Sequence, residues 1–68
     1  MSAYRYSFFE RDGRLHATLL LYSRSDEEAC ELANDLLSRS ECAEVELSHR
    51  GGLVYRVGRA DTGETNVA

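Results

Sequence analysis

The segment that most constrains the fold of this chain is residues 25–39. Apolar side chains recur there at intervals of three and four residues, which places them on one face of an α-helix. Ser25 and Glu28 match the S-x-x-E capping box, and acidic residues in the first turn favour the positive end of the helix dipole. The sequence therefore predicts one amphipathic helix that buries a single apolar stripe. The stripe consists of Ala29, Leu32, Ala33, Leu36 and Leu37.

Two alternating segments, residues 4–11 and 14–22, precede the helix and flank Asp12 and Gly13. An Asp-Gly pair between alternating runs predicts a two-residue type I′ hairpin turn. That turn would set Arg11 opposite Arg14 and Phe8 opposite Ala17, and opposed residues share a face of the sheet. The face predicted to be core holds Tyr4, Tyr6, Phe8, Leu15, Ala17, Leu19 and Leu21. The other face holds Arg5, Ser7, Phe9, His16, Thr18, Leu20 and Tyr22.

Two further alternating segments follow the helix. Residues 42–48 (or 49) and 53–57 (or 58) flank a second turn at residues 50–52, which has the sequence Arg-Gly-Gly. The predicted core side of this hairpin consists of Ala43, Val45, Leu47, Leu53, Tyr55 and Val57. Glu44, Glu46, Val54 and Arg56 take the other side. Residues 60–68 show no periodicity and are expected to form a disordered C-terminal tail.

These elements predict an α+β domain of order ββαββ, covering residues 1–59. It would be a four-stranded, mainly antiparallel sheet with one helix packed on one face. We expect the first strand to lie in the centre of the sheet beside the third strand, with the first strand beside the fourth as the alternative.

Length and charge limit the function classes. A chain of 68 residues forms one domain at most, and its stability is expected to be marginal. The net charge of −4 disfavours nucleic acids and anionic membranes, which attract clustered positive charge. Two cysteines are too few for a disulfide scaffold, and neither a signal peptide nor a membrane span is evident. We therefore expect a cytoplasmic location.

Few residues in the sequence have side chains that suggest metal binding or catalysis. The soft metal ligands are His16, Cys30, Cys42 and His49. Their spacing matches no zinc pattern, and strand alternation places only Cys42 and His16 on one face, the face away from the helix. Nothing in the sequence orients that histidine as a base. We therefore expect no metal, no cofactor and no enzymatic activity.

The sheet face away from the helix is the predicted interaction surface. It would present Arg5, Phe9, His16, Leu20, Tyr22, Val54 and Arg56. Phe9, Leu20, Tyr22 and Val54 are more apolar than solvent requires, so a contiguous patch of them would mark a contact surface. They could equally lie scattered on an ordinary wet face.

The expected function is protein–protein interaction or self-association, through the sheet face or an edge strand. The alternative is a nucleic-acid or small-ligand binding module on the same face, where aromatic and arginine side chains would stack on bases. Glu44 and Glu46 on that face disfavour a phosphate backbone.

Four short segments carry a resemblance to known proteins. They are Tyr4-Arg5-Tyr6-Ser7-Phe8-Phe9, Asp12-Gly13-Arg14, Asp26-Glu27-Glu28-Ala29 and Val45-Glu46-Leu47. In these segments, and over nearly all of its length before the tail, the chain resembles a group of short uncharacterised bacterial proteins. The resemblance implies a small ββαββ domain. It implies no activity and transfers no catalytic residue.

Overall fold

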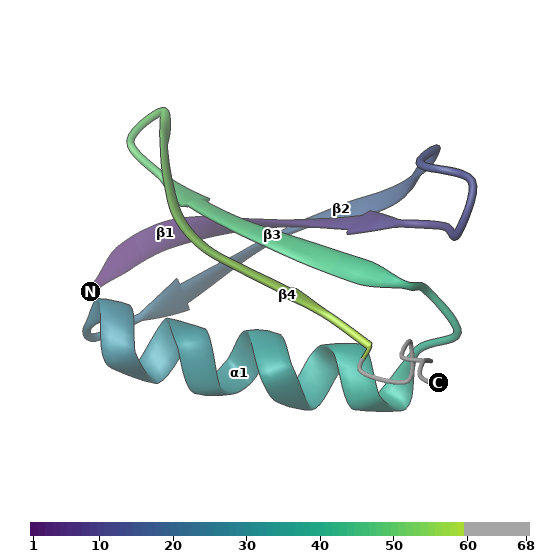
Figure 1. Ribbon diagram of the computed structural model, residues 1–68. Coiled ribbons are helices and arrows are strands. Elements are labelled where there is room, and N and C mark those ends of the chain that lie inside the picture. Colours follow the sequence, from purple (N-terminus) through teal and green to yellow (C-terminus); the bar gives the residue numbers. More distant parts are fainter. Residues whose placement is uncertain (60–68) are drawn as a thin grey trace.

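A computed structural model describes residues 1–59 and contains one antiparallel sheet and one helix (Figure 1). The elements are β1 (Ser2–Phe9), β2 (Leu15–Ser23), α1 (Asp26–Arg39), β3 (Glu44–His49) and β4 (Gly52–Gly58). The strand order is β2-β1-β3-β4, which confirms both the ββαββ fold and the preferred central position of β1 beside β3. The predicted tail lies outside the described residues.

The helix begins where its cap predicts. Ser25 has extended backbone, and its Oγ accepts a hydrogen bond from the Glu28 N–H at 3.1 Å. The Glu28 carboxylate reaches back to accept from the Arg24 N–H at 2.7 Å, one residue before the position that a standard capping box uses. At the other end, the Ser40 N–H donates to the Leu37 carbonyl. Local capping therefore defines both ends of α1.

The first turn differs from the predicted type I′ turn. The Gly13 N–H donates to the Glu10 carbonyl at 2.9 Å, and Gly13 alone in this loop has a positive φ, +89°. The Arg14 N–H also donates to the Asp12 carboxylate at 3.0 Å. The loop therefore has three residues, with a left-handed glycine after the turn. Arg11 does not face Arg14, because Arg14 pairs with Glu10 instead.

A bulge in β2 compensates for the longer loop. Phe9 pairs with Leu15, whereas Phe8 pairs with Ala17, so His16 is the surplus residue. From Ala17 onward the pairing is the predicted one, with Tyr6 opposite Leu19. The prediction is therefore wrong only near the turn. There, Leu15 lies on the open face with Phe9.

The second hairpin has the same kind of irregularity. Its two-residue turn, Arg50 and Gly51, has positive φ at both positions, 56° and 83°, which is the type I′ pattern. A register shift follows, because Leu47 pairs with Tyr55 whereas Ser48 pairs with Leu53. Val54 is the surplus residue here.

The shift exchanges two predicted faces. Val54 packs against the core instead of lying on the open face, and Leu53 is exposed instead of buried.

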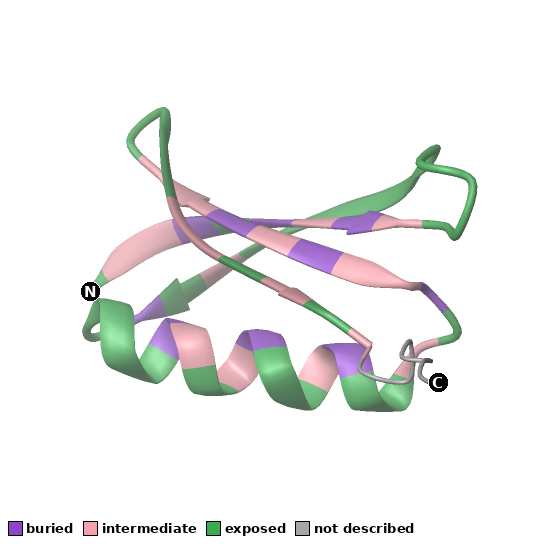
Figure 2. Cartoon of the chain, viewed as in Figure 1, coloured by how far each residue is buried: buried purple, intermediate pink, exposed green. Residues whose placement is uncertain are grey.

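The core lies between α1 and the two central strands. It consists of Tyr4, Tyr6, Phe8, Ala29, Ala33, Leu37, Cys42, Val45 and Leu47. Among the described residues, β2 contributes none of this cluster; Figure 2 shows it exposed along most of its length. The prediction that Leu15, Ala17 and Leu19 are core residues is therefore wrong. An α-helix is about 10 Å wide and strands lie about 4.8 Å apart, so one helix covers only about two strands.

Two tyrosines link the helix to the sheet. The Tyr4 hydroxyl donates to the Asp26 carboxylate at 2.6 Å, at the start of α1, and the Tyr55 hydroxyl donates to Asn34 Oδ1 at 3.1 Å. The bond to Asp26 and the burial of the phenol raise the pKa of Tyr4 to about 12. At the other end of the helix, Arg59 donates to the carbonyls of Leu37, Ser40 and Cys42. No helix among residues 1–59 is long and apolar enough to cross a membrane.

Truncation of Leu37 tests this core. Leu37→Ala should lower the free energy of unfolding by about 2–5 kcal/mol, because it leaves a cavity between α1 and the sheet. Leu36, which is half-buried, should cost less when it is truncated in the same way. Leu53→Ala is the matched surface control and should stay within about 0.5 kcal/mol of the parent. Urea unfolding measures all three variants, and equal losses at Leu37 and Leu53 would contradict the described packing.

The Tyr4–Asp26 bond predicts a loss of stability in alkali. The unfolded phenol ionises near its ordinary pKa of 10.0, and the folded one near about 12. The stabilisation is therefore complete below pH 10.0 and is lost as the pH rises toward the folded value. Tyr4→Phe should flatten this decline, whereas Tyr22→Phe at an exposed position should leave it unchanged. The measurement is the urea midpoint as a function of pH. Parallel curves for both variants and the parent would contradict the assignment.

Candidate interaction surface

The predicted surface residues do not form one patch. Val54 lies on the helix side, and so does His16, which lines a groove together with Phe8 and Ala17. Arg5, Phe9, Leu20, Tyr22 and Arg56 remain on the open face. Their strand partners fix their positions there.

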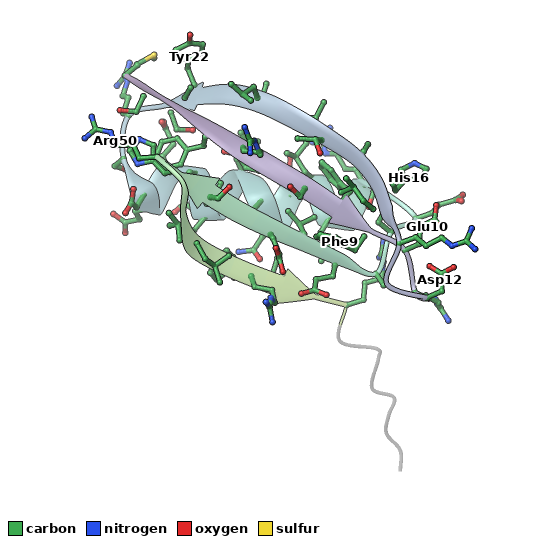
Figure 3. All side chains as sticks on the ribbon, turned by 90° about the horizontal axis from the view of Figure 1, so that it is seen from above. Phe9, Glu10, Asp12, His16, Tyr22 and Arg50 are labelled. Atoms are coloured by element: carbon green, nitrogen blue, oxygen red, sulfur yellow. The ribbon has the colours of Figure 1, made fainter. Side chains whose placement is uncertain are left out.

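The open face is divided by its polar residues. Phe9 pairs with Leu15 near the first turn, and Leu20 pairs with Arg5 farther along. The Ser7–Thr18 pair lies between them. Figure 3 shows Phe9 and Tyr22 well apart on the sheet. Of the two alternatives for these apolar residues, the structure therefore favours separate positions over one contiguous patch.

An ion-pair network occupies the side of this face formed by β3 and β4. Arg56 Nε lies 2.9 Å from a carboxylate oxygen of Glu44, and its Nη2 lies 3.0 Å from one of Glu46. Two carboxylates thus neutralise this arginine and leave a local excess of negative charge. The arrangement is poor for binding a phosphate backbone.

The apolar surface gathers instead on β2, an edge strand. Leu15, Leu20 and Tyr22 are exposed on its open face by 59, 58 and 68%. Leu19 is 41% exposed on the opposite face, because the helix does not reach under this part of the strand. Residues 15–23 contain no acidic residue, lysine or arginine. We call these nine residues the β2 strip.

Below the β2 strip, on the helix side, lies a groove of about 640 Å³. The inner faces of β1 and β2, the first turn and the loop that follows α1 line it. The lining residues are Phe8, Glu10, Arg11, His16, Ala17, Leu19, Ser40, Glu41 and Cys42. The volume is within the range of small-molecule sites.

Two residues with chemical potential line this groove. His16 Nδ1 lies 3.0 Å from a Glu10 carboxylate oxygen, so the histidine is oriented after all. Cys42 is buried and also lines the groove, which corrects its predicted position on the open face. No hydrogen bond joins Cys42 to His16 within the described part of the chain. The structure therefore brings these residues to one groove without forming a nucleophile–base pair.

The other two soft ligands lie elsewhere. The His49 ring stacks on Tyr4 with centroids 4.3 Å apart, and Cys30 lies half-buried on α1. Burial, and then the neighbouring carboxylates of Asp26 and Glu27, raise the pKa of the Cys30 thiol and so disfavour its reactive thiolate. Residues 1–59 contain no group of three side chains arranged to hold a metal ion.

The comparisons with known proteins add no assignment. Neither protein families, nor curated proteins, nor solved structures give a match to this chain.

The β2 strip was missed as a continuous surface, although a signal for it was present. Leu19 and Leu20 are adjacent in the sequence, so they point to opposite faces of any strand. A strand that is apolar on both faces needs cover on both faces, whereas a single helix can cover only one face of the sheet and here leaves most of β2 exposed. The width of one helix and the number of strands together predict that part of the sheet stays uncovered.

Removal of Arg56 tests the ion-pair network. Arg56→Met should lower the free energy of unfolding by about 0.2–1 kcal/mol at low salt and by less at high salt, because exposed ion pairs are screened. Arg5→Met is the matched control, since Arg5 lies on the same face and makes no ion pair among the described residues. Urea unfolding at two ionic strengths measures the difference. Equal salt dependence in the two variants would argue against the network.

Proposed function

We propose that the protein is a non-enzymatic binding domain that recognises protein along the β2 strip. One observation carries the proposal: an edge strand that exposes large apolar side chains on both faces. Such a strand is a ready template for pairing with another chain, and natural proteins normally protect it with charges, prolines or short length. The β2 strip is nine residues long and has no charged side chain of Asp, Glu, Lys or Arg and no proline. Its one protective irregularity is the bulge near the first turn.

Strand addition accounts for this combination of features. In that mode the main chain of the partner pairs with the free edge, while alternate side chains contact both faces of the enlarged sheet. The added strand would shield the exposed Leu19 from water on the helix side of the sheet and the exposed Leu20 on the open face. Complete burial of one leucine side chain contributes about 1.5–3 kcal/mol, so a few such contacts support a specific complex.

The binding alternatives have less support. Glu44 and Glu46 hold Arg56 in ion pairs, which opposes nucleic-acid binding on the open face. A small apolar ligand would fit the groove better than the open face. The β2 strip forms one wall of that groove, so a protein on the strip would limit access to it.

We infer that this binding takes place in the cytoplasm. Cys30 and Cys42 are both free thiols, as is usual in a reducing compartment.

Site-specific photo-crosslinking in the cells that produce the protein tests the proposal. Tyr22→p-benzoylphenylalanine places the probe on the β2 strip, and Leu53→p-benzoylphenylalanine places it on the opposite edge strand, where exposure is a similar 60%. Covalent protein adducts should form several-fold more at position 22. Equal yields at the two positions, or none at position 22, would refute the proposal.

A further inference from the structure

The free edge of β2 offers a defined set of backbone groups. The Ala43 N–H donates to the Phe9 carbonyl at 2.8 Å, so the backbone of Phe9 faces away from β2. Backbone direction alternates along a strand, so Phe8, Tyr6 and Tyr4 face β2. Their partners on β2 are Ala17, Leu19 and Leu21, and these residues form the ladder with β1.

The residues between them point outward. Thr18, Leu20 and Tyr22 therefore direct their N–H and C=O groups to the free edge, where no strand among residues 1–59 pairs with them. Unpaired edge groups accept a further antiparallel strand in the same alternating pattern.

Charge indicates which strand would pair with the free edge of β2. The chain carries a net charge of −4, so two copies repel each other least where they meet through a surface without charged side chains. The β2 strip contains no Asp, Glu, Lys or Arg, whereas the exposed side of α1 carries Glu27, Glu31 and Asp35. A strand that is apolar on both faces matches a copy of itself.

The other edge strand is a weaker candidate. Strand β4 has seven residues, begins and ends with glycine, and carries the charged Arg56. Glycine weakens strand pairing, and Arg56 is already held by β3. The two edges are therefore not equivalent.

We propose that the partner on the β2 strip is a second copy of this chain. This inference rests on the proposed function and specifies its partner. The two β2 strands pair antiparallel around a two-fold axis, and the two sheets become one sheet of eight strands. Both helices then lie on the same side of it, because the axis is perpendicular to the sheet.

The register follows from the regular part of the strand. Strand β2 spans Leu15–Ser23, and an axis at Leu19 pairs residues 17–21 with the same residues of the second copy, so the bulge at His16 lies outside this paired segment. Thr18 then hydrogen-bonds with the partner's Leu20, and both residues have outward-facing backbone groups. Leu19 meets the partner's Leu19 in a non-hydrogen-bonded pair, where Cα atoms are about 4.5 Å apart. Leu21 meets the partner's Ala17, which extends the apolar floor of the groove across the junction.

Cysteine crosslinking tests this geometry. Leu19→Cys should form a disulfide between copies readily, because a separation of about 4.5 Å suits one. Leu21→Cys is the matched control on the same face. Its two copies are offset by four residues, or about 13 Å along the strand, which is too far for a disulfide. The parent chain, with Cys30 and Cys42, gives the background. Faster crosslinking of Leu20→Cys than of Leu19→Cys would overturn the register.

Sedimentation velocity of the purified chain tests the pairing itself. The parent should sediment with twice the mass of one chain. Thr18→Pro removes only an outward N–H, so it should keep the circular dichroism of the parent and weaken dimerisation roughly tenfold or more. Leu19→Pro removes a ladder N–H and should unfold the chain instead. A Thr18→Pro variant that is folded and dimerises like the parent would overturn the proposal.

The two proposals fail in different ways. If the parent remains monomeric up to about 1 mM, where even weak pairing is detectable, the second copy is excluded. An adduct at position 22 with a different protein would then still support strand addition. If position 22 gives no adduct while the purified chain also remains monomeric, both proposals are wrong.

Discussion

The packing of α1 against β1 and β3 is the constraint on which the rest of the structure depends. Small residues on the helix, Ala29 and Ala33, allow close approach to the large side chains of the central strands, among them Tyr6 and Leu47. The contact extends to β4, whose Val54, Tyr55 and Val57 pack against the core, but it leaves most of β2 uncovered.

The two edge strands, β4 and β2, are held to the rest of the fold to different degrees. Strand β4 turns Val54 and Val57 toward the core, bonds Tyr55 to the helix and pairs Arg56 with β3. Strand β2 has only Leu21 partly packed and Ser23 buried. This asymmetry between the two edges, more than any single residue, supports β2 as the proposed binding surface.

Local signals made much of the fold predictable. The Ser25 cap and the apolar stripe define the helix within its own fifteen residues, and the alternation of β1 and β2 fixes the pairing of Phe8 with Ala17. These features depend on near neighbours in the sequence. They do not depend on how the helix and the sheet pack against each other.

The failures concern properties that are not local. The Asp-Gly pair suits a two-residue turn and a three-residue turn alike, so the sequence does not decide on which side Leu15 and His16 emerge. Leu19 has the pattern of a core residue and is exposed only because the helix lies under other strands. Its burial is a property of layer width, which alternation does not encode. The candidate surface consequently moved from the middle of the open face to an edge.

The two bulges have a consequence for how this fold tolerates changes in chain length. Each one holds a single surplus residue, His16 or Val54, close to its turn. Deletion of His16 would restore regular pairing locally and leave Ala17 and all later residues on their present faces. Deletion of one residue in the middle of β1 would instead turn every side chain beyond it to the opposite face. Variants of this domain that differ in length should therefore carry their differences beside the turns, and the central strands should keep their length.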